Sequence, residues 1–141
     1  MKFGLMSGDT IPAGELRSFG FEAVQVFFSG GDSDPSSEDV DKILKADDIA
    51  LAAMTLHVSL VGVQGAIQAD VERLVECVEK TAGLKGRFGD NECPLLIWHP
   101  SEYPSAADVD DNVVFQGLCQ ALASACIVAE DKGVHIAVEI T

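Results

Sequence analysis

Four polar side chains lie where short apolar runs end: Ser7, His57, His99 and Glu139. Runs of this kind are typical of buried strands. Consecutive parallel strands bring their carboxyl ends to one edge of a sheet, where catalytic groups gather. Two imidazoles and a carboxylate suit a borderline divalent cation, because nitrogen and oxygen donors neutralise it without thiolates. The first hypothesis is therefore a metal or substrate site at this edge.

The run that ends in Glu139 follows a Lys-Gly helix stop at 132–133 and spans 135–141. Strand alternation places His135, Ala137, Glu139 and Thr141 on one face. A carboxylate is costly to bury there unless it meets a cation, a metal or a dense hydrogen-bond network. The alternative is a glutamate exposed to solvent beyond a frayed strand.

The two histidines have a structural alternative as well, because a strand-end histidine is often hydrogen-bonded to backbone. His99 is the stronger candidate, since it interrupts an apolar run and precedes a proline. In the run 50–57, alternation places Leu51 and His57 on one face. Gln25 is expected to hydrogen-bond a buried partner, and Trp98 to face the covering helices as core.

Helices and strands alternate along the chain, which is typical of consecutive βαβ units with a parallel sheet. Strands are predicted at 2–7, 23–28, 50–57, 93–100 and 135–141, and helices at 12–19, from 36 or 37 to about 44, at 67–82 and from 108 to about 129. In the last helix the predicted buried stripe is Val114, Leu118, Leu122, Ala125, Cys126 and Ala129. Two architectures remain open, a doubly wound sheet and a (β/α) barrel. No dinucleotide fingerprint, Walker loop or Gly-x-Ser-x-Gly elbow occurs in the sequence.

The amino-acid composition limits the classes of molecule that this chain is expected to bind. The 141 residues are 48% hydrophobic, which is enough for one core. The net charge is −14 with nine Lys and Arg, which argues against nucleic acid. No run is long enough for a membrane span and no signal peptide precedes the first strand, so a cytoplasmic location is expected. The four cysteines form no Cys-x-x-Cys pair and are predicted to be reduced core thiols.

Four segments resemble the xylose isomerase-like TIM-barrel superfamily, which contains sugar and sugar-phosphate isomerases, ketose 3-epimerases and endonuclease IV. The segments are Lys2–Ser7, Phe19–Gln25, Trp98-His-Pro100 and Lys132–Glu139. The resemblance implies an α/β fold of the parallel (β/α) TIM-barrel type, incomplete, with about five strands of eight. A complete barrel of this type needs about 250 residues, so residues 1–141 are expected to form the N-terminal portion of one domain.

The resemblance also implies roles for the strand-end residues. Its fifth-strand Gly-Val-x-Ile-Ala-x-Glu pattern ends in a divalent-metal ligand, which corresponds to Glu139. His99 resembles the histidine of a His-Pro-Gly motif, with Ser101 in place of the glycine, and His57 resembles a third-strand histidine more loosely. Gln25 occupies a position that often holds glutamate in the family. The implied cofactor is a divalent ion, Mn, Mg, Co or Zn.

Three hypotheses follow. The first is a metal-dependent sugar or sugar-phosphate isomerase or epimerase that forms an enediolate. In it Glu139 and His99 are catalytic residues and metal ligands, and His57 and Ser7 bind substrate. The second is a metal-dependent phosphodiesterase resembling endonuclease IV, against which the acidity counts. The third is a non-catalytic half-barrel that associates with another chain through its unpaired edge strands, and a homo-oligomer is among the states it predicts.

Overall fold

The computed structural model describes residues 4–6, 14–28, 34–57, 67–89, 93–99 and 111–139. It contains the strands β1 (Gly4–Met6), β2 (Ala23–Phe28), β3 (Ala50–His57), β4 (Leu95–His99) and β5 (His135–Val138). The helices are α1 (Ser37–Asp47), α2 (Ile67–Gly83) and α3 (Asp111–Lys132), with 3-10 turns η1 (Arg17–Phe19) and η3 (Lys85–Arg87). None of the helices in these segments is long and apolar enough to cross a membrane.

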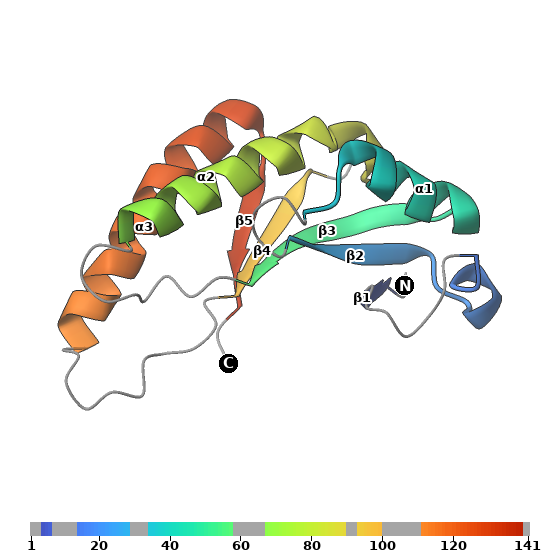
Figure 1. The fold of residues 1–141 in the computed structure, drawn as a ribbon, viewed down its shortest axis with the longest axis horizontal. Helices are drawn as coiled ribbons and strands as arrows, with labels where there is room; N and C mark the ends of the chain where they lie inside the picture. Colours follow the sequence, from blue (N-terminus) through green and yellow to red (C-terminus); the bar gives the residue numbers. More distant parts are fainter. Residues whose placement is uncertain are drawn as a thin grey trace.

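The five strands form one parallel sheet whose spatial order follows the chain, β1-β2-β3-β4-β5. All three α-helices lie over the same face of this sheet (Figure 1). A doubly wound sheet reverses its strand order and carries helices on both faces. The sequential order and the one-sided helices therefore decide between the two architectures. The predicted fold class, part of a (β/α) barrel, is confirmed.

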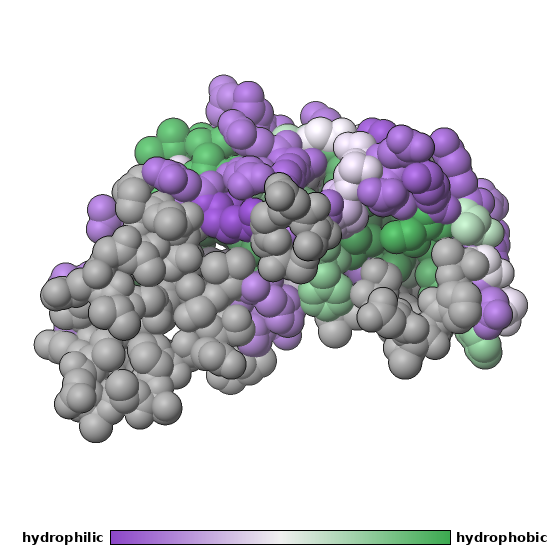
Figure 2. All heavy atoms as spheres, in the orientation of Figure 1, coloured by the Kyte–Doolittle hydropathy of each residue, from purple (hydrophilic) through white to green (hydrophobic). Residues whose placement is uncertain are grey.

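The core lies between the sheet and the helices. In β2, β3 and β4 the residues that point toward the helices are almost inaccessible to solvent, and each such aliphatic or aromatic side chain contributes about 2 kcal/mol by leaving water. They are Val24, Val26, Phe28, Leu51, Met54, Leu56, Leu96 and Trp98. The expectation that Trp98 belongs to the core is confirmed. Figure 2 shows hydrophilic side chains over the outer sides of α1 and α2, with apolar side chains beneath α1.

Strand β3 contains an irregularity that changes which side chains face the core. Val24 pairs with Leu51 but Gln25 pairs with Ala53, so Ala52 has no partner in β2. Laterally paired residues of adjacent strands point to the same face, and a one-residue bulge shifts the alternation. Leu51 therefore points toward the helices with Val24. The prediction that Leu51 shares a face with His57 is wrong for this reason.

The edge at which the strands begin is tied together by two carboxylates. Asp47, at the end of α1, is buried and accepts hydrogen bonds from the backbone N–H of Gly14 (2.8 Å) and of Arg17 (3.2 Å). Asp41 receives two hydrogen bonds from Arg87, Nε to Oδ1 at 2.8 Å and Nη2 to Oδ2 at 3.1 Å. The hydrogen bond from Arg87 lowers the pKa of Asp41. These contacts join α1 to the segment before β2 and to the segment before β4.

The connection after β1 differs from its prediction. In the described part, 14–28, a helix predicted at 12–19 is present only as the 3-10 turn η1. Gly14 has φ +101° and Gly20 has φ +86°, values that L side chains rarely adopt and that interrupt a right-handed helix on both sides. The glycines therefore limit this segment to a single turn.

Helices α1 and α2 lie where the sequence predicts them. Ser36 caps α1 through a capping box with Asp39, and Val40 and Leu44 are buried. In α2 the buried side includes Leu74 and Val78. Both helices therefore cover the sheet with an apolar side.

The predicted buried stripe of helix α3 is confirmed only in part: Ala125 and Ala129 are buried, whereas the side chain of Val114 lies outside the part that the structure describes. The most buried positions of α3 are small residues at four-residue intervals: Gly117, Ala121, Ala125 and Ala129. Leu118 and Leu122 are half-buried, and Cys126 is exposed. Of the four cysteines only Cys77 is buried, so the prediction of core thiols is wrong for the other three.

Candidate functional site

Three of the four predicted site residues lie side by side at the carboxyl edge of the sheet. His57 and His99 are lateral partners in the β3–β4 pairing. The N–H of Glu139 donates to the carbonyl of Trp98 at 2.9 Å, which continues the β4–β5 pairing one residue beyond Val138 and places Glu139 beside His99. Adjacent strands are about 4.8 Å apart. His57, His99 and Glu139 thus form a row across three strands, on the face that α1, α2 and α3 leave uncovered.

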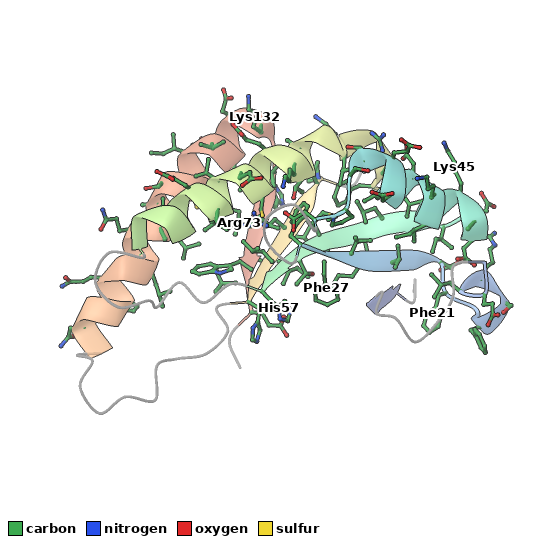
Figure 3. All side chains as sticks on the ribbon, viewed as in Figure 1. Phe21, Phe27, Lys45, His57, Arg73 and Lys132 are labelled. Atoms are coloured by element: carbon green, nitrogen blue, oxygen red, sulfur yellow. The ribbon has the colours of Figure 1, made fainter. Side chains whose placement is uncertain are left out.

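Aromatic contacts fix the rings in this row. The imidazoles of His57 and His99 stack with centroids 4.8 Å apart and an interplanar angle of 20°. The ring of Phe27, from β2, meets His57 edge-on at 5.1 Å and 66°. Figure 3 shows Phe27 and His57 on the side of the sheet opposite the helices. The row therefore begins with an apolar ring and continues through two ordered imidazoles.

A neutral hydrogen bond lies beneath the row. The side-chain amide of Gln25 donates to the hydroxyl oxygen of Thr55, and Thr55 is fully buried. The expectation that Gln25 hydrogen-bonds a buried partner is confirmed. The uncovered face therefore has a polar but uncharged floor here, at the position where the resembling family often carries a carboxylate.

The row is open to solvent to different degrees. His57 and Glu139 are exposed and His99 is half-buried. Glu139 therefore pays no large desolvation cost in this structure, and the argument that it needs a buried partner does not apply. Ser7, the fourth predicted site residue, lies outside the described residues.

The side chains match a divalent cation in type. His99 and Glu139, one strand apart on the same level, supply a nitrogen and an oxygen donor. The third donor does not converge with them, because His57 is stacked parallel to His99. Within the described ranges, no group of three His, Cys, Asp or Glu side chains is arranged to hold a metal ion.

A second polar cluster was not predicted. The buried carboxylate of Asp34, which follows β2, accepts from Arg73 Nη2 at 2.6 Å and from Lys80 Nζ at 3.0 Å, and Lys80 also pairs with Glu76 at 2.7 Å. The hydrogen bonds that Lys80 donates to Glu76 and then to Asp34 raise the pKa of Lys80. The side chain of Arg73 is only 15% exposed, so this ion pair is largely removed from solvent. The signal for this contact was the spacing of Arg73, Glu76 and Lys80 along one side of α2.

Comparison with known proteins identifies the fold. No protein-family model matches the chain, and no curated protein matches it. Among solved structures the chain is similar to mannonate dehydratase from Streptococcus suis serotype 2, with a TM-score of 0.64 and 12% sequence identity. The match covers 98% of this chain and 53% of that chain, so this chain spans about half the length of the solved structure. At this identity the likeness is one of fold, that of a TIM-barrel-like protein.

Proposed function

We propose that this chain carries part of the active site of a divalent-metal-dependent isomerase or epimerase that acts on a small sugar or sugar phosphate. The observation that supports it is the row of His57, His99 and Glu139 on the uncovered face. It lies at the carboxyl edge, where (β/α) barrels hold their catalytic groups. The likeness in fold to an enzyme of sugar-acid metabolism is consistent with this class.

In this proposal Glu139 accepts a proton from the carbon next to the substrate carbonyl, and the electron pair left behind forms an enediolate. Return of the proton to the neighbouring carbon gives the isomer, whereas return to the opposite side of the same carbon gives the epimer. His99 donates a hydrogen bond to a substrate oxygen. A divalent cation bound by Glu139 and His99 would supply positive charge beside the enediolate oxygens.

The neighbouring side chains suit a neutral polyhydroxy substrate. Phe27 presents a ring surface on which the C–H face of a sugar can pack, and a ring nitrogen of an imidazole can bond to a hydroxyl. The Gln25–Thr55 pair adds no charge beneath them. Ser7 is assigned to substrate binding on the sequence prediction alone.

Dehydration of a sugar acid is a second candidate, favoured by the name of the similar enzyme, mannonate dehydratase. It begins with the same step, removal of a proton from the carbon next to a carboxylate. Hydroxide then leaves the following carbon and is protonated to water. The phosphodiesterase hypothesis is weaker, because nine basic residues against a net charge of −14 offer little attraction for a phosphate backbone.

Proton exchange tests the shared first step without requiring complete turnover. The chain is incubated in D₂O with Mn²⁺ or Mg²⁺ and a panel of aldoses, ketoses, their phosphates and aldonates, and loss of the C–H signal next to the carbonyl is followed by NMR. Glu139→Gln is expected to abolish exchange, because the amide is no base. Glu79→Gln, an exposed acid on α2, is the matched control and should leave exchange unchanged. Equal exchange in wild type and Glu139→Gln would remove Glu139 from this role.

A second experiment measures metal binding directly. Titration of Mn²⁺ followed by electron paramagnetic resonance should show weaker binding in His99→Ala and in Glu139→Gln, since each removes one donor. The Glu79→Gln control should bind as wild type does. Undiminished binding in both site variants would place the cation elsewhere.

A further inference from the structure

Three aromatic rings are in contact across β2, β3 and β4, on the face of the sheet that the helices leave uncovered. The ring of Phe27 meets the imidazole of His57 edge-on, with centroids 5.1 Å apart and an angle of 66° between the planes. His57 in turn stacks on His99, with centroids 4.8 Å apart and planes only 20° from parallel. His57 is therefore the middle ring, and it contacts both of its neighbours.

The pairing of the strands explains this order of rings. His57 and His99 are lateral partners, and adjacent strands lie about 4.8 Å apart, which is close to the distance between the two imidazole centroids. Phe27 pairs with Thr55, two residues before His57 in β3, so its ring reaches the imidazole diagonally. The contact between the three rings thus follows from the register of β2, β3 and β4.

The stacked geometry argues against the binding of one atom by both imidazoles. An imidazole nitrogen offers its lone pair in the plane of the ring, and a bound zinc ion lies about 2.0 to 2.1 Å from that nitrogen. Two rings that stack nearly parallel have separate planes, so their lone pairs do not meet at one point. The same holds for hydrogen bonds to one substrate oxygen. His57 therefore acts on its neighbour through the face of its ring.

A flat neighbour limits the rotation of the His99 ring. The χ2 torsion of histidine has broad, roughly two-fold minima, so an imidazole turns easily unless something packs against it. Turning the plane of His99 would push the edge of its ring into His57. His57 is itself exposed to solvent, and the half-buried Phe27 limits its rotation in the same way. The orientation of His99 thus depends on two rings that need not touch the substrate.

We propose that His57 is a positioning residue, which holds the plane of the His99 imidazole by stacking and is itself held by Phe27. This role replaces the substrate contact that the sequence predicts for His57. An ordered ring binds without the entropy cost of immobilising one side chain, which corresponds to about two- to tenfold in affinity. The effect on binding rests on the proposed function, because it concerns what His99 binds. The orientation of the ring is measured without any ligand.

Two substitutions at position 57 separate stacking from nitrogen chemistry. His57→Ala removes the ring, whereas His57→Phe keeps a flat ring and removes both nitrogens. Protons beside the face of an aromatic ring are shielded. In NMR spectra of the chain without ligand, the His99 ring resonances should therefore move downfield in His57→Ala and stay shielded in His57→Phe. His99→Gln identifies these resonances by their loss. Unmoved His99 resonances in His57→Ala would overturn the proposal.

Titration with Mn²⁺, followed by electron paramagnetic resonance, measures the consequence for binding. The affinity should fall about two- to tenfold in His57→Ala and return to the wild-type value in His57→Phe. His135→Ala is the matched control and should bind as wild type does. His135 is an exposed histidine on the same face of the sheet, about 13 Å along β5 from Glu139. Circular dichroism verifies that each variant is folded.

The outcomes of the titration are distinguishable. An equal loss in His57→Ala and His57→Phe would make His57 a ligand through its nitrogen and overturn the proposal. Full affinity in His57→Ala would overturn it as well. A wild-type chain that binds no Mn²⁺ would refute the cation of the proposed function, and the NMR comparison would then decide the positioning role by itself.

Discussion

Replacement of Asp47 by alanine removes the acceptor that joins α1 to the segment before β2. The buried carboxylate receives two backbone hydrogen bonds, at 2.8 Å and 3.2 Å. A hydrogen bond to a charged group contributes about 1.5 to 3 kcal/mol. Gly14 and Arg17 are themselves exposed, so water can replace part of what is lost, and the lower end of that range applies. The expected decrease in the free energy of unfolding is about 3 kcal/mol. That is a large share of the roughly 5 to 15 kcal/mol of a typical domain.

Urea unfolding measures this loss, with Trp98 as the reporter because it is the only tryptophan and is fully buried. With a slope of about 1.5 kcal/mol per molar urea, the midpoint should fall by about 2 M. Asp47→Asn should lose less, because one side-chain oxygen remains as acceptor. Glu79→Ala, an exposed acid, is the control and should stay within about 0.5 kcal/mol of wild type. A value for Asp47→Ala inside that same interval would refute the role given to this carboxylate.

Three further residues, Cys77, Asp34 and Thr55, give testable predictions. Burial raises the pKa of the Cys77 thiol from 9.0 to about 12. At pH 8 iodoacetamide should therefore modify only the three exposed cysteines of the folded chain, which mass spectrometry can count. A fourth label before unfolding would contradict this. The folded state holds that proton more tightly than the unfolded chain, so the Cys77 contribution to stability should be present below pH 9 and lost as the pH rises toward 12, and Cys77→Ala should flatten this part of the pH profile. Asp34→Asn should lower the free energy of unfolding, measured in urea, by about 2 to 3 kcal/mol. This is less than the roughly 3 to 5 kcal/mol lost when a fully buried ion pair is broken, because Lys80 is 35% exposed. No loss would mean that water replaces the ion pair. Thr55→Val should lower the free energy of unfolding by about 1 to 2 kcal/mol, because it leaves the Gln25 amide without its acceptor. The double variant Thr55→Val, Gln25→Leu should lose less than the sum of the two single variants. Strict additivity would show that the hydrogen bond contributes nothing to stability.

The alternation of strands with helices and the level of the site row could be predicted because both depend on local sequence. The run Ala23–Phe28 is bounded by turn residues, and its strand has the predicted limits. His57 and His99 each end an apolar run, and parallel pairing then makes them neighbours. The likeness in fold to a barrel-type protein agrees with the architecture that the resemblance implied.

Features that depend on pairing or packing could not be predicted in this way. The bulge at Ala52 arises from the register between β2 and β3, which no pattern within β3 encodes. Helix α3 has apolar or small residues on almost every side, so helical spacing alone cannot identify the buried one, and close packing against α2 selects the alanines. The stacking of the two imidazoles, and thus the failure of His57 to converge with the other donors, is likewise a property of the assembled sheet.

The contacts of Asp47 and Asp41 lie at the edge where the strands begin, whereas His57, His99 and Glu139 lie at the edge where they end. The length of the strands separates these two sets of residues. Substitutions among the three site residues should therefore leave the stability of the fold nearly unchanged, because the contacts that hold α1 in place are not among their neighbours. Descendants of this sequence could acquire a new substrate at one edge while the other edge stays under selection for folding alone.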